Sequence, residues 1–213
     1  MRSKEISYIT NQLNNILNTK FLQLKETISE VSKNTKSGNI TINSNKKVFN
    51  FDKIADMVYN GNSKPKSVDM IHIQNNIIYL IEFKDVLIFR EDKEDKEDKE
   101  DKEDKEDKED KEDKEDKEDI KSNIKLKSIE SLIILHKLLE NLNINFSKII
   151  DLNIYYYIVC KENINLEQNA LNRSRVYNNA MLANIPHYKN TYFKDIKISS
   201  FKSFEKDFIL KYF

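Results

Sequence analysis

The fold of this chain is decided by residues 67–85, which read SVDMIHIQNNIIYLIEFKD. Two segments of this stretch, Val68–Gln74 and Ile77–Asp85, are rich in the Ile, Val, Tyr and Phe residues that favour strands. Asn75-Asn76 lies between them, and asparagine tolerates the positive φ angles of a two-residue primed turn. The stretch therefore predicts a β-hairpin.

The same turn predicts the register of the hairpin. If Gln74 pairs with Ile77, then Asp69 lies directly across from Glu82. Because side chains alternate along a strand, the residues divide between two faces. One face is expected to carry Asp69, Ile71, Ile73, Ile78, Leu80, Glu82 and Lys84. The other is expected to carry Val68, Met70, His72, Ile77, Tyr79, Ile81 and Phe83. Both faces are largely apolar, which predicts that both are covered.

Three charged side chains gather at one end of the first face. Asp69 and Glu82 as opposed residues would have Cβ atoms about 5 Å apart, and their charges would repel each other. A divalent cation removes that repulsion and prefers oxygen ligands. Lys84 lies beside them and could order a water molecule. The pattern indicates a metal site with a neighbouring ammonium group.

Asp69 followed by Glu82-Phe83-Lys84 resembles the active-site signature of the PD-(D/E)XK nuclease superfamily. The core of that family runs helix, three strands, helix, strand, with the aspartate starting the second strand and the (D/E)-x-K ending the third. The resemblance covers about residues 20–161 without the charged insert described below. The family's proline often directly precedes the aspartate, whereas here Pro65 lies four residues upstream.

This resemblance implies an α/β fold with a mixed central sheet flanked by helices and an αβββαβ core. It also implies a nuclease that hydrolyses phosphodiester bonds with Mg²⁺ or Mn²⁺, with DNA favoured over RNA as substrate. By the resemblance, Asp69, Glu82 and the main-chain carbonyl of Phe83 hold the metal. Lys84 would then orient the attacking water and offset the charge that develops in the transition state.

Other interpretations of the same residues remain open. Glu82 and Lys84 could form an ordinary ion pair on an edge strand. The chain could also be a non-catalytic module that keeps the fold and binds nucleic acid or acts as a scaffold, because a fold does not dictate an activity. A third alternative is an interaction protein that works mainly through its acidic segment.

Residues 91–119 form that segment, with nine copies of Glu-Asp-Lys followed by Glu-Asp. This repeat contains 20 acidic residues and 9 lysines, while the other 184 residues contain 27 basic and 16 acidic residues. A repeat with no apolar residue cannot join a core, so a solvated helix or disorder is expected. The zero net charge of the whole chain therefore conceals a basic body, which suits a polyanionic partner such as nucleic acid.

The pattern of apolar residues predicts one domain over residues 1–213, interrupted by the insert. Helical spacing or strand-like composition indicates the following elements. Helices are expected at 4–33, 51–59, 120–142, 166–182 and 204–213, and strands at 40–51, 148–161 and 192–199 in addition to the hairpin. Met57 is expected to pack inward with its neighbours in the second of these helices.

Further polar residues are candidates by position. Lysines before the Asp69 strand, and lysines at the start of the helix after the hairpin, could contact phosphates or could merely be solvated. They are Lys64, Lys66, Lys121, Lys125 and Lys127. Acidic residues of the first helix and of the short helix before the hairpin could approach the metal or could stay on the surface. They are Glu26, Glu30, Asp52 and Asp56.

Cysteine and histidine give little sign of other chemistry. Cys160 is the only cysteine and lies in an apolar run, so it is expected to be a buried small residue. The absence of a possible intrachain disulfide favours an intracellular setting, in cytoplasm or nucleus. The three histidines His72, His136 and His187 lack zinc-ligand spacing. The sequence contains no apolar stretch of about 18 residues, so we expect a soluble protein without membrane contact.

Overall fold

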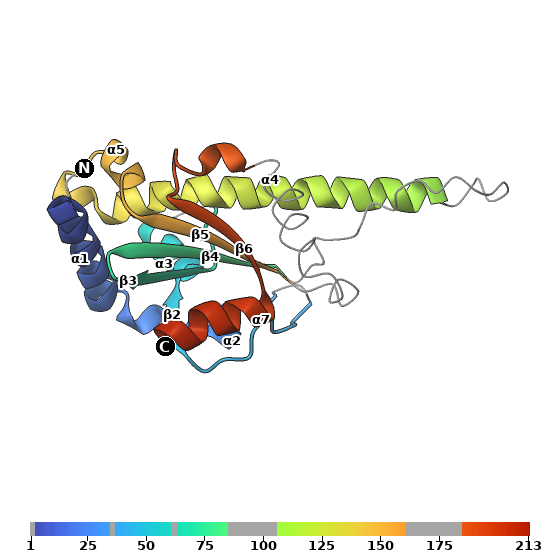
Figure 1. Cartoon of the computed structure of the whole chain (residues 1–213), viewed down its shortest axis with the longest axis horizontal. Helices are drawn as coiled ribbons and strands as arrows, with labels where there is room; N and C mark the ends of the chain where they lie inside the picture. Colours follow the sequence, from blue (N-terminus) through green and yellow to red (C-terminus); the bar gives the residue numbers. More distant parts are fainter. Residues whose placement is uncertain (1–2, 35–36, 61–63, 85–105, 161–184) are drawn as a thin grey trace.

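The structure is a computed structural model that describes residues 3–34, 37–60, 64–84, 106–160 and 185–213 (Figure 1). The first part of the charged repeat and the helix predicted at 166–182 lie outside these residues. Within residues 106–121 the backbone is described, but the side chains are not.

The predicted hairpin is confirmed. Its strands are β3 (Met70–Gln74) and β4 (Ile77–Lys84), and the ladder runs from Gln74 opposite Ile77 to Met70 opposite Ile81. Asn75 and Asn76 have φ angles of 51° and 61°, which are the positive values that a type I′ turn needs. The register is therefore the one that the sequence predicts.

Six strands of the described residues form one open, mixed sheet in sequence order. The other four are β1 (Lys25–Thr27), β2 (Lys47–Asn50), β5 (Ile154–Cys160) and β6 (Asp195–Ser200). Strands β1 to β4 pair antiparallel, whereas β5 pairs parallel with β4 and β6 pairs parallel with β5. The fold is thus α/β with a mixed central sheet, as expected.

One side of the sheet, here called the α4 face, packs against four helices (Figure 1). They are α1 (Ser3–Lys20), α3 (Phe51–Val58), α4 (Glu106–Leu138) and α5 (Phe146–Ile150). Leu13, Ile54 and Leu135 from these helices form one buried cluster with Ile71 and Leu80 of the hairpin. The N-terminal half of α4 extends away from the other described elements (Figure 1).

The opposite side, here called the aromatic face, is covered by α2 (Ile28–Val31) and by the C-terminal helix. That helix comprises α7 (Phe201–Phe204), a π-helical turn η5 (Glu205–Ile209) and α8 (Leu210–Tyr212), which together account for the helix predicted at 204–213. It buries Phe204 and Phe208 against Tyr79 and Ile81. Both faces of the hairpin are therefore covered, as predicted.

The single helix predicted at 4–33 is wrong. α1 ends at Lys20, a short 3₁₀ turn η1 (Leu22–Leu24) follows, and the chain then enters the sheet as β1. Thr27 and Glu30 form a capping box that starts α2. The apolar spacing continues because α1 packs on the α4 face while α2 packs on the aromatic face. One periodic pattern thus serves two helices on opposite sides of the sheet.

Two predicted strands are shorter than expected. The segment predicted at 148–161 begins within α5, and only its second half, from Ile154, is strand. Ile149 is buried from the helix, and an apolar run does not distinguish a buried helical turn from a strand. The strand predicted at 40–51 is confined to β2. The strand predicted at 192–199 corresponds to β6, at the edge of the sheet.

Three smaller differences remain. Met57 is half exposed and does not pack inward. Val68 packs with the α4-face cluster, because the chain bends at Asp69 and the strand alternation starts only at Met70. The helix predicted at 120–142 starts inside the repeat, at Glu106, and is followed by a 3₁₀ turn η2 (Glu140–Leu142). A further 3₁₀ turn, η4 (Pro186–Tyr188), precedes β6.

Candidate functional site

The hairpin brings two carboxylates together at the end of its α4 face. Asp69 lies one residue before β3, and its Oδ2 accepts a hydrogen bond of 2.6 Å from the Phe83 amide. Glu82 lies near the end of β4 and has no solvent-exposed side-chain surface. The Asp69 carboxylate therefore contacts the partner strand just past the last ladder pair, at the level of Glu82.

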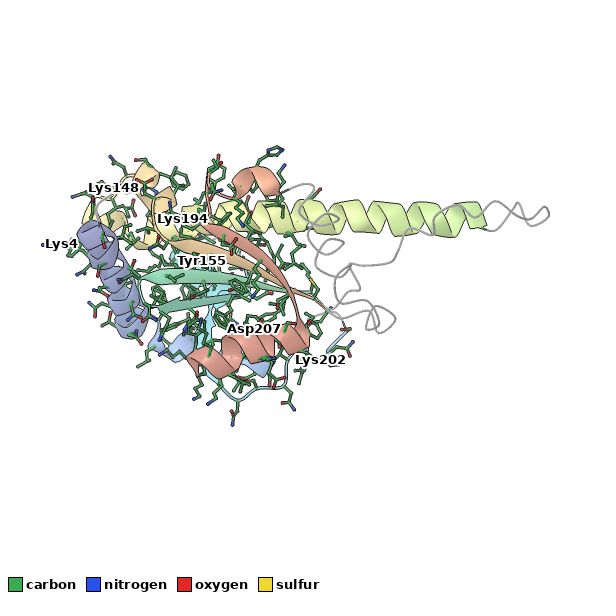
Figure 2. All side chains as sticks on the ribbon, in the orientation of Figure 1. Lys4, Lys148, Tyr155, Lys194, Lys202 and Asp207 are labelled. Atoms are coloured by element: carbon green, nitrogen blue, oxygen red, sulfur yellow. The ribbon has the colours of Figure 1, made fainter. Side chains whose placement is uncertain are left out.

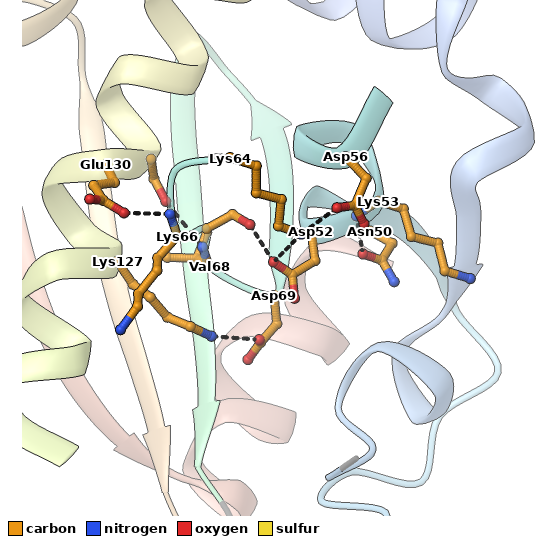
Figure 3. Close-up of polar contacts among 12 residues, drawn as sticks. Asn50, Asp52, Lys53, Asp56, Lys64, Lys66, Val68, Asp69, Lys127 and Glu130 are labelled. Atoms are coloured by element: carbon orange, nitrogen blue, oxygen red, sulfur yellow. Dashed lines mark hydrogen bonds and ion pairs between the residues drawn. The ribbon is translucent and has the colours of Figure 1, made fainter. Parts of the chain in front are cut away.

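Two lysines complete a group that we call the charged site, composed of Asp69, Glu82, Lys84 and Lys127. Lys84 Nζ lies 2.7 Å from Glu82 Oε1. Lys127, from α4, reaches both acids: its Nζ lies 3.2 Å from Asp69 Oδ1, 2.9 Å from Glu82 Oε1 and 3.0 Å from Glu82 Oε2. Figure 3 shows Lys127 extending from its helix toward Asp69. The site thus pairs two carboxylates with two ammonium groups.

One oxygen of this site depends on ion pairs. Glu82 Oε1 is fully buried, and two ammonium nitrogens lie near it, that of Lys84 at 2.7 Å and that of Lys127 at 2.9 Å. These two positive charges offset the cost of burying the carboxylate.

Burial and like charge change the protonation of Asp69. Its pKa is raised to about 7, first by burial and then by the neighbouring Glu82 charge, against the opposing effects of Lys127, the Phe83 amide and Lys84. Burial lowers the pKa of Lys127, but Glu82 and Asp69 outweigh burial, so that the pKa lies above its ordinary value. Lys127 is therefore a permanent cation in this site.

Packing around α4 positions Lys127. Ser131 Oγ accepts a 3.0 Å hydrogen bond from the Val68 amide, next to Asp69. The buried Tyr156 hydroxyl donates to the Ile124 carbonyl at 3.2 Å, one helical turn before Lys127. These two contacts attach α4 to the segment just before β3 and to β5, on either side of the lysine.

Among the lysines predicted as phosphate contacts, Lys64 and Lys66 have protein partners. Lys64 pairs with Asp56 at 2.6 Å and approaches Asp52 at 3.8 Å (Figure 3). The Lys66 amide donates to Glu130, and its ammonium donates to Asn123. Lys125 Nζ is exposed and lies 5.6 Å from the centre of the Tyr188 ring. The side chain of Lys121 lies outside the described part of the chain.

The four acidic side chains predicted as possible metal ligands also have partners within the protein. Glu30 belongs to the capping box of α2, and Asp56 belongs to the pair with Lys64. Glu26 accepts from Asn50 at 2.7 Å and also pairs with Lys53. Asp52 accepts from Ser67, and its charge contributes to the raised pKa of Lys127. Of these four acids, Asp52 therefore has an electrostatic effect on the charged site.

Lys127 is the member of the charged site that the sequence signature does not include. A signal for it exists in the helical spacing of α4. Ile124, Ser128 and Ser131 are buried, and Lys127 lies on the same side of the helix as they do. A lysine on the buried side of a helix needs a buried partner, and this helix passes the end of the hairpin.

The remaining candidates are structural. Cys160 is buried, and burial raises its pKa to about 12, so its thiol stays protonated. The His136 Nε2 atom is hydrogen-bonded to the Ile144 carbonyl at 2.9 Å. His72 belongs to the aromatic face, where its ring contacts Phe208 and Tyr79.

Within the described residues no three His, Cys, Asp or Glu side chains form a group that could hold a metal. The charged site offers two carboxylates, which is a sufficient protein contribution for Mg²⁺, because Mg²⁺ commonly binds one or two carboxylates and completes its shell with water and phosphate.

No helix of the described residues is long and apolar enough to cross a membrane. Comparison with known proteins adds no further guide, since no family model, no curated protein and no solved structure matches this sequence.

Proposed function

We propose that this protein is a nuclease of the PD-(D/E)XK type that uses Mg²⁺ or Mn²⁺ to hydrolyse phosphodiester bonds in nucleic acid, with DNA as the favoured substrate. The observation that carries this proposal is the meeting of Asp69, Glu82 and Lys84 at one end of a buried hairpin. Buried charges cost stability, so their convergence at the end of an apolar sheet favours a functional role.

The arrangement of elements supports the same proposal. A helix precedes the antiparallel strands β2, β3 and β4, then α4 follows, and β5 pairs parallel with β4. This is the order and pairing expected of an αβββαβ core. Asp69 directly precedes the second of these three strands, and Glu82-Phe83-Lys84 ends the third.

The residues of the site fit a divalent ion. Asp69 Oδ1 and both Glu82 oxygens approach one common point, which the Lys127 ammonium occupies, so the three oxygens already surround one cation. Asp69, Glu82 and the Phe83 carbonyl are the groups that would hold the ion. A bound ion supplies a Lewis acid for the scissile phosphate and lowers the pKa of water.

Lys84 would act on the substrate side of the reaction. Lys84 is about one-fifth exposed beside Glu82, from where its ammonium can orient the attacking water and stabilise negative charge on the phosphate. The body outside the repeat carries 27 basic and 16 acidic residues, and this excess favours a polyanionic substrate.

A second candidate function also has a specific observation in its favour. Two carboxylates and two ammonium groups balance each other, so the charged site is neutral without any metal. A closed ion-pair cluster of this kind would suit a non-catalytic module of the same fold that binds nucleic acid or acts as a scaffold.

One panel of reactions separates the two functions. The protein is incubated with plasmid, single-stranded DNA and RNA, in Mg²⁺, in Mn²⁺ and in chelator. We expect cleavage that requires metal and that falls at least about a hundredfold in Asp69→Asn and in Lys84→Ala. Lys148→Ala is the matched control, because Lys148 pairs with Glu5 and projects from α5 (Figure 2).

The opposite outcome is equally clear. Binding of nucleic acid without cleavage, unchanged by Asp69→Asn and Lys84→Ala in folded protein, would support the non-catalytic module and contradict the nuclease. Circular dichroism of each variant verifies that the protein is folded before the comparison is made.

A further inference from the structure

Lys127 occupies the position between the two carboxylates where a divalent ion would have to bind. Its ammonium contacts Asp69 Oδ1 at 3.2 Å and the Glu82 oxygens at 2.9 and 3.0 Å. Mg²⁺ and Ca²⁺ bind such oxygens at about 2.0 to 2.6 Å. An ion and the ammonium group therefore cannot contact the same three oxygens at the same time.

The balance of charge also argues against binding the ion while both ammonium groups stay in the site. With both acids ionised and both lysines in place the charged site is neutral, and adding a divalent ion would leave an excess of two positive charges in a largely buried position. Repulsion between cations about 4 Å apart is strong where water is largely excluded. One of the two ammonium groups must leave when the ion binds.

Geometry selects Lys127 as the group that leaves. Lys127 bridges both acids, whereas Lys84 pairs with Glu82 alone. Both ammonium groups are about one-fifth exposed on flexible four-carbon stems, so exposure does not distinguish them and the bridging position of Lys127 does.

We propose that Lys127 is an internal cation that competes with the divalent ion for Asp69 and Glu82. In the metal-free protein it holds the two acids together, and metal binding displaces it from the pair. This inference rests on the proposed metal site, but it assigns Lys127 a role that the nuclease signature does not contain. It makes Lys127 a positioning residue that sets the metal affinity.

The test is a titration of the protein with Mn²⁺ alone, followed by calorimetry, for wild type and Lys127→Met. Methionine keeps the length of the side chain but has neither a charge nor a ligand for a hard cation. We expect Lys127→Met to bind Mn²⁺ about tenfold more tightly or better, because the competitor is gone. Its melting temperature without metal should fall below that of wild type, and saturating Mn²⁺ should raise it more than in wild type.

Lys125→Met is the matched control. Lys125 lies on the same helix two residues away, is exposed, and contacts no member of the charged site among the described residues. Its removal should leave the Mn²⁺ affinity within about twofold of wild type. A larger gain in this variant would overturn the proposal, since it would show a general effect of positive charge on α4.

A measurement on the wild-type protein covers the case in which Lys127→Met fails to fold. Lysines are labelled with acetic anhydride and the modified peptides are quantified by mass spectrometry, with and without saturating Mn²⁺. We expect Lys127 to react more slowly than Lys125 without metal, and its reactivity to rise several-fold with metal. Unchanged labelling of Lys127 at saturating Mn²⁺, or unchanged or weaker Mn²⁺ binding by folded Lys127→Met, overturns the proposal.

These outcomes are distinct from failure of the proposed function. If the wild type binds Mn²⁺ but Lys127 neither competes nor changes reactivity, only the present inference is wrong. If neither wild type nor Lys127→Met binds Mn²⁺, both the inference and the metal-dependent nuclease are wrong.

Discussion

The two faces of the hairpin carry different kinds of side chain: one ends in a group of charges and the other packs against aromatic rings. On the α4 face, the apolar positions Ile71 and Leu80 lead to a group of four charges, of which Glu82 is fully buried and the other three are about one-fifth exposed. On the aromatic face, the alternate positions His72 and Tyr79 pack among rings of the C-terminal helix, where Phe208 lies 5.0 Å from Tyr79 between ring centres. The same two strands carry both sets of residues.

This difference indicates that the aromatic face contributes mainly to stability and the charged site mainly to function. Aromatic pairs at these distances stabilise a fold beyond the area that they bury. Buried ion pairs are at best a small net gain, because desolvation offsets their attraction. We therefore expect changes on the aromatic face to alter the free energy of unfolding, and changes in the charged site to alter metal binding.

The substitution with the largest expected effect is Phe208→Ala, which tests whether the aromatic face determines stability without affecting metal binding. Phe208 is buried and contacts rings from three strands and from its own helix, including His72, Tyr79 and Tyr157. Its truncation should lower the free energy of unfolding by about 3 to 5 kcal/mol, measured by urea denaturation. Mn²⁺ affinity should stay within about twofold of wild type in the folded protein.

Leu210→Ala is the control for Phe208→Ala, because Leu210 belongs to the same helix and is 76% exposed. Its free energy of unfolding should change by less than about 0.5 kcal/mol. If folded Phe208→Ala loses Mn²⁺ affinity by tenfold or more, the two faces are coupled and the proposed separation is wrong.

A smaller effect should come from the titration of His72. The pKa of this imidazole is lowered to about 4, mainly by burial and in smaller part by the charge of Lys25; Tyr79 and Tyr212 are the titratable groups whose rings lie near it. Nε2 has no hydrogen-bond partner in the described part of the chain. The neutral form is therefore the one that the folded protein accommodates.

Because the pKa of His72 is lower in the folded protein than in the unfolded chain, the free energy of unfolding falls as the pH falls. Between about pH 6.5 and 4 the unfolded chain binds a proton at this residue and the folded protein does not, so stability is lost as the pH falls. Relative to His72→Phe, the wild type should lose up to about 3 kcal/mol between pH 7.5 and 4. Urea denaturation at several pH values measures this, and parallel curves for the two proteins would contradict it.

The sequence predicts the hairpin and its charges well because their determinants are local. A two-residue turn and a period of two determine the register, and the register alone brings Asp69 to the level of Glu82. It does not predict where the first helix ends. Leu17 and Ile28 obey one helical spacing, yet they bury on opposite sides of a sheet whose first strand lies between them.

Lys127 marks the limit of the same approach at the site. Its place on the buried side of α4 is readable from the sequence, but its partners lie 45 and 58 residues away. Local patterns predict that such a lysine needs an acid, and only the packing of α4 across the hairpin determines which acid. The sequence predicts Lys127 only as a possible phosphate contact and Lys84 as the lysine of the site, so the position of Lys127 between the two acids is not predicted.

The smallest predicted effect concerns the turn that both faces share. Asn76 has a φ of 61°, which glycine adopts without steric cost, and Asn-Gly is the preferred pair for a type I′ turn. The greater freedom of glycine in the unfolded chain cancels part of this gain. Asn76→Gly should therefore raise the free energy of unfolding by only about 0.5 kcal/mol in urea denaturation.

The control is a glycine substitution within a helix, which should lower the free energy of unfolding rather than raise it. Asn11 is an exposed residue within α1, so Asn11→Gly should lower the free energy of unfolding by a few tenths of a kcal/mol. Because the turn determines the register without touching the charged site or the aromatic rings, Asn76→Gly should change neither the Mn²⁺ affinity nor the pH dependence due to His72. A destabilised Asn76→Gly would show that the asparagine side chain itself holds the turn, and that the register of both faces depends on more than the backbone angles.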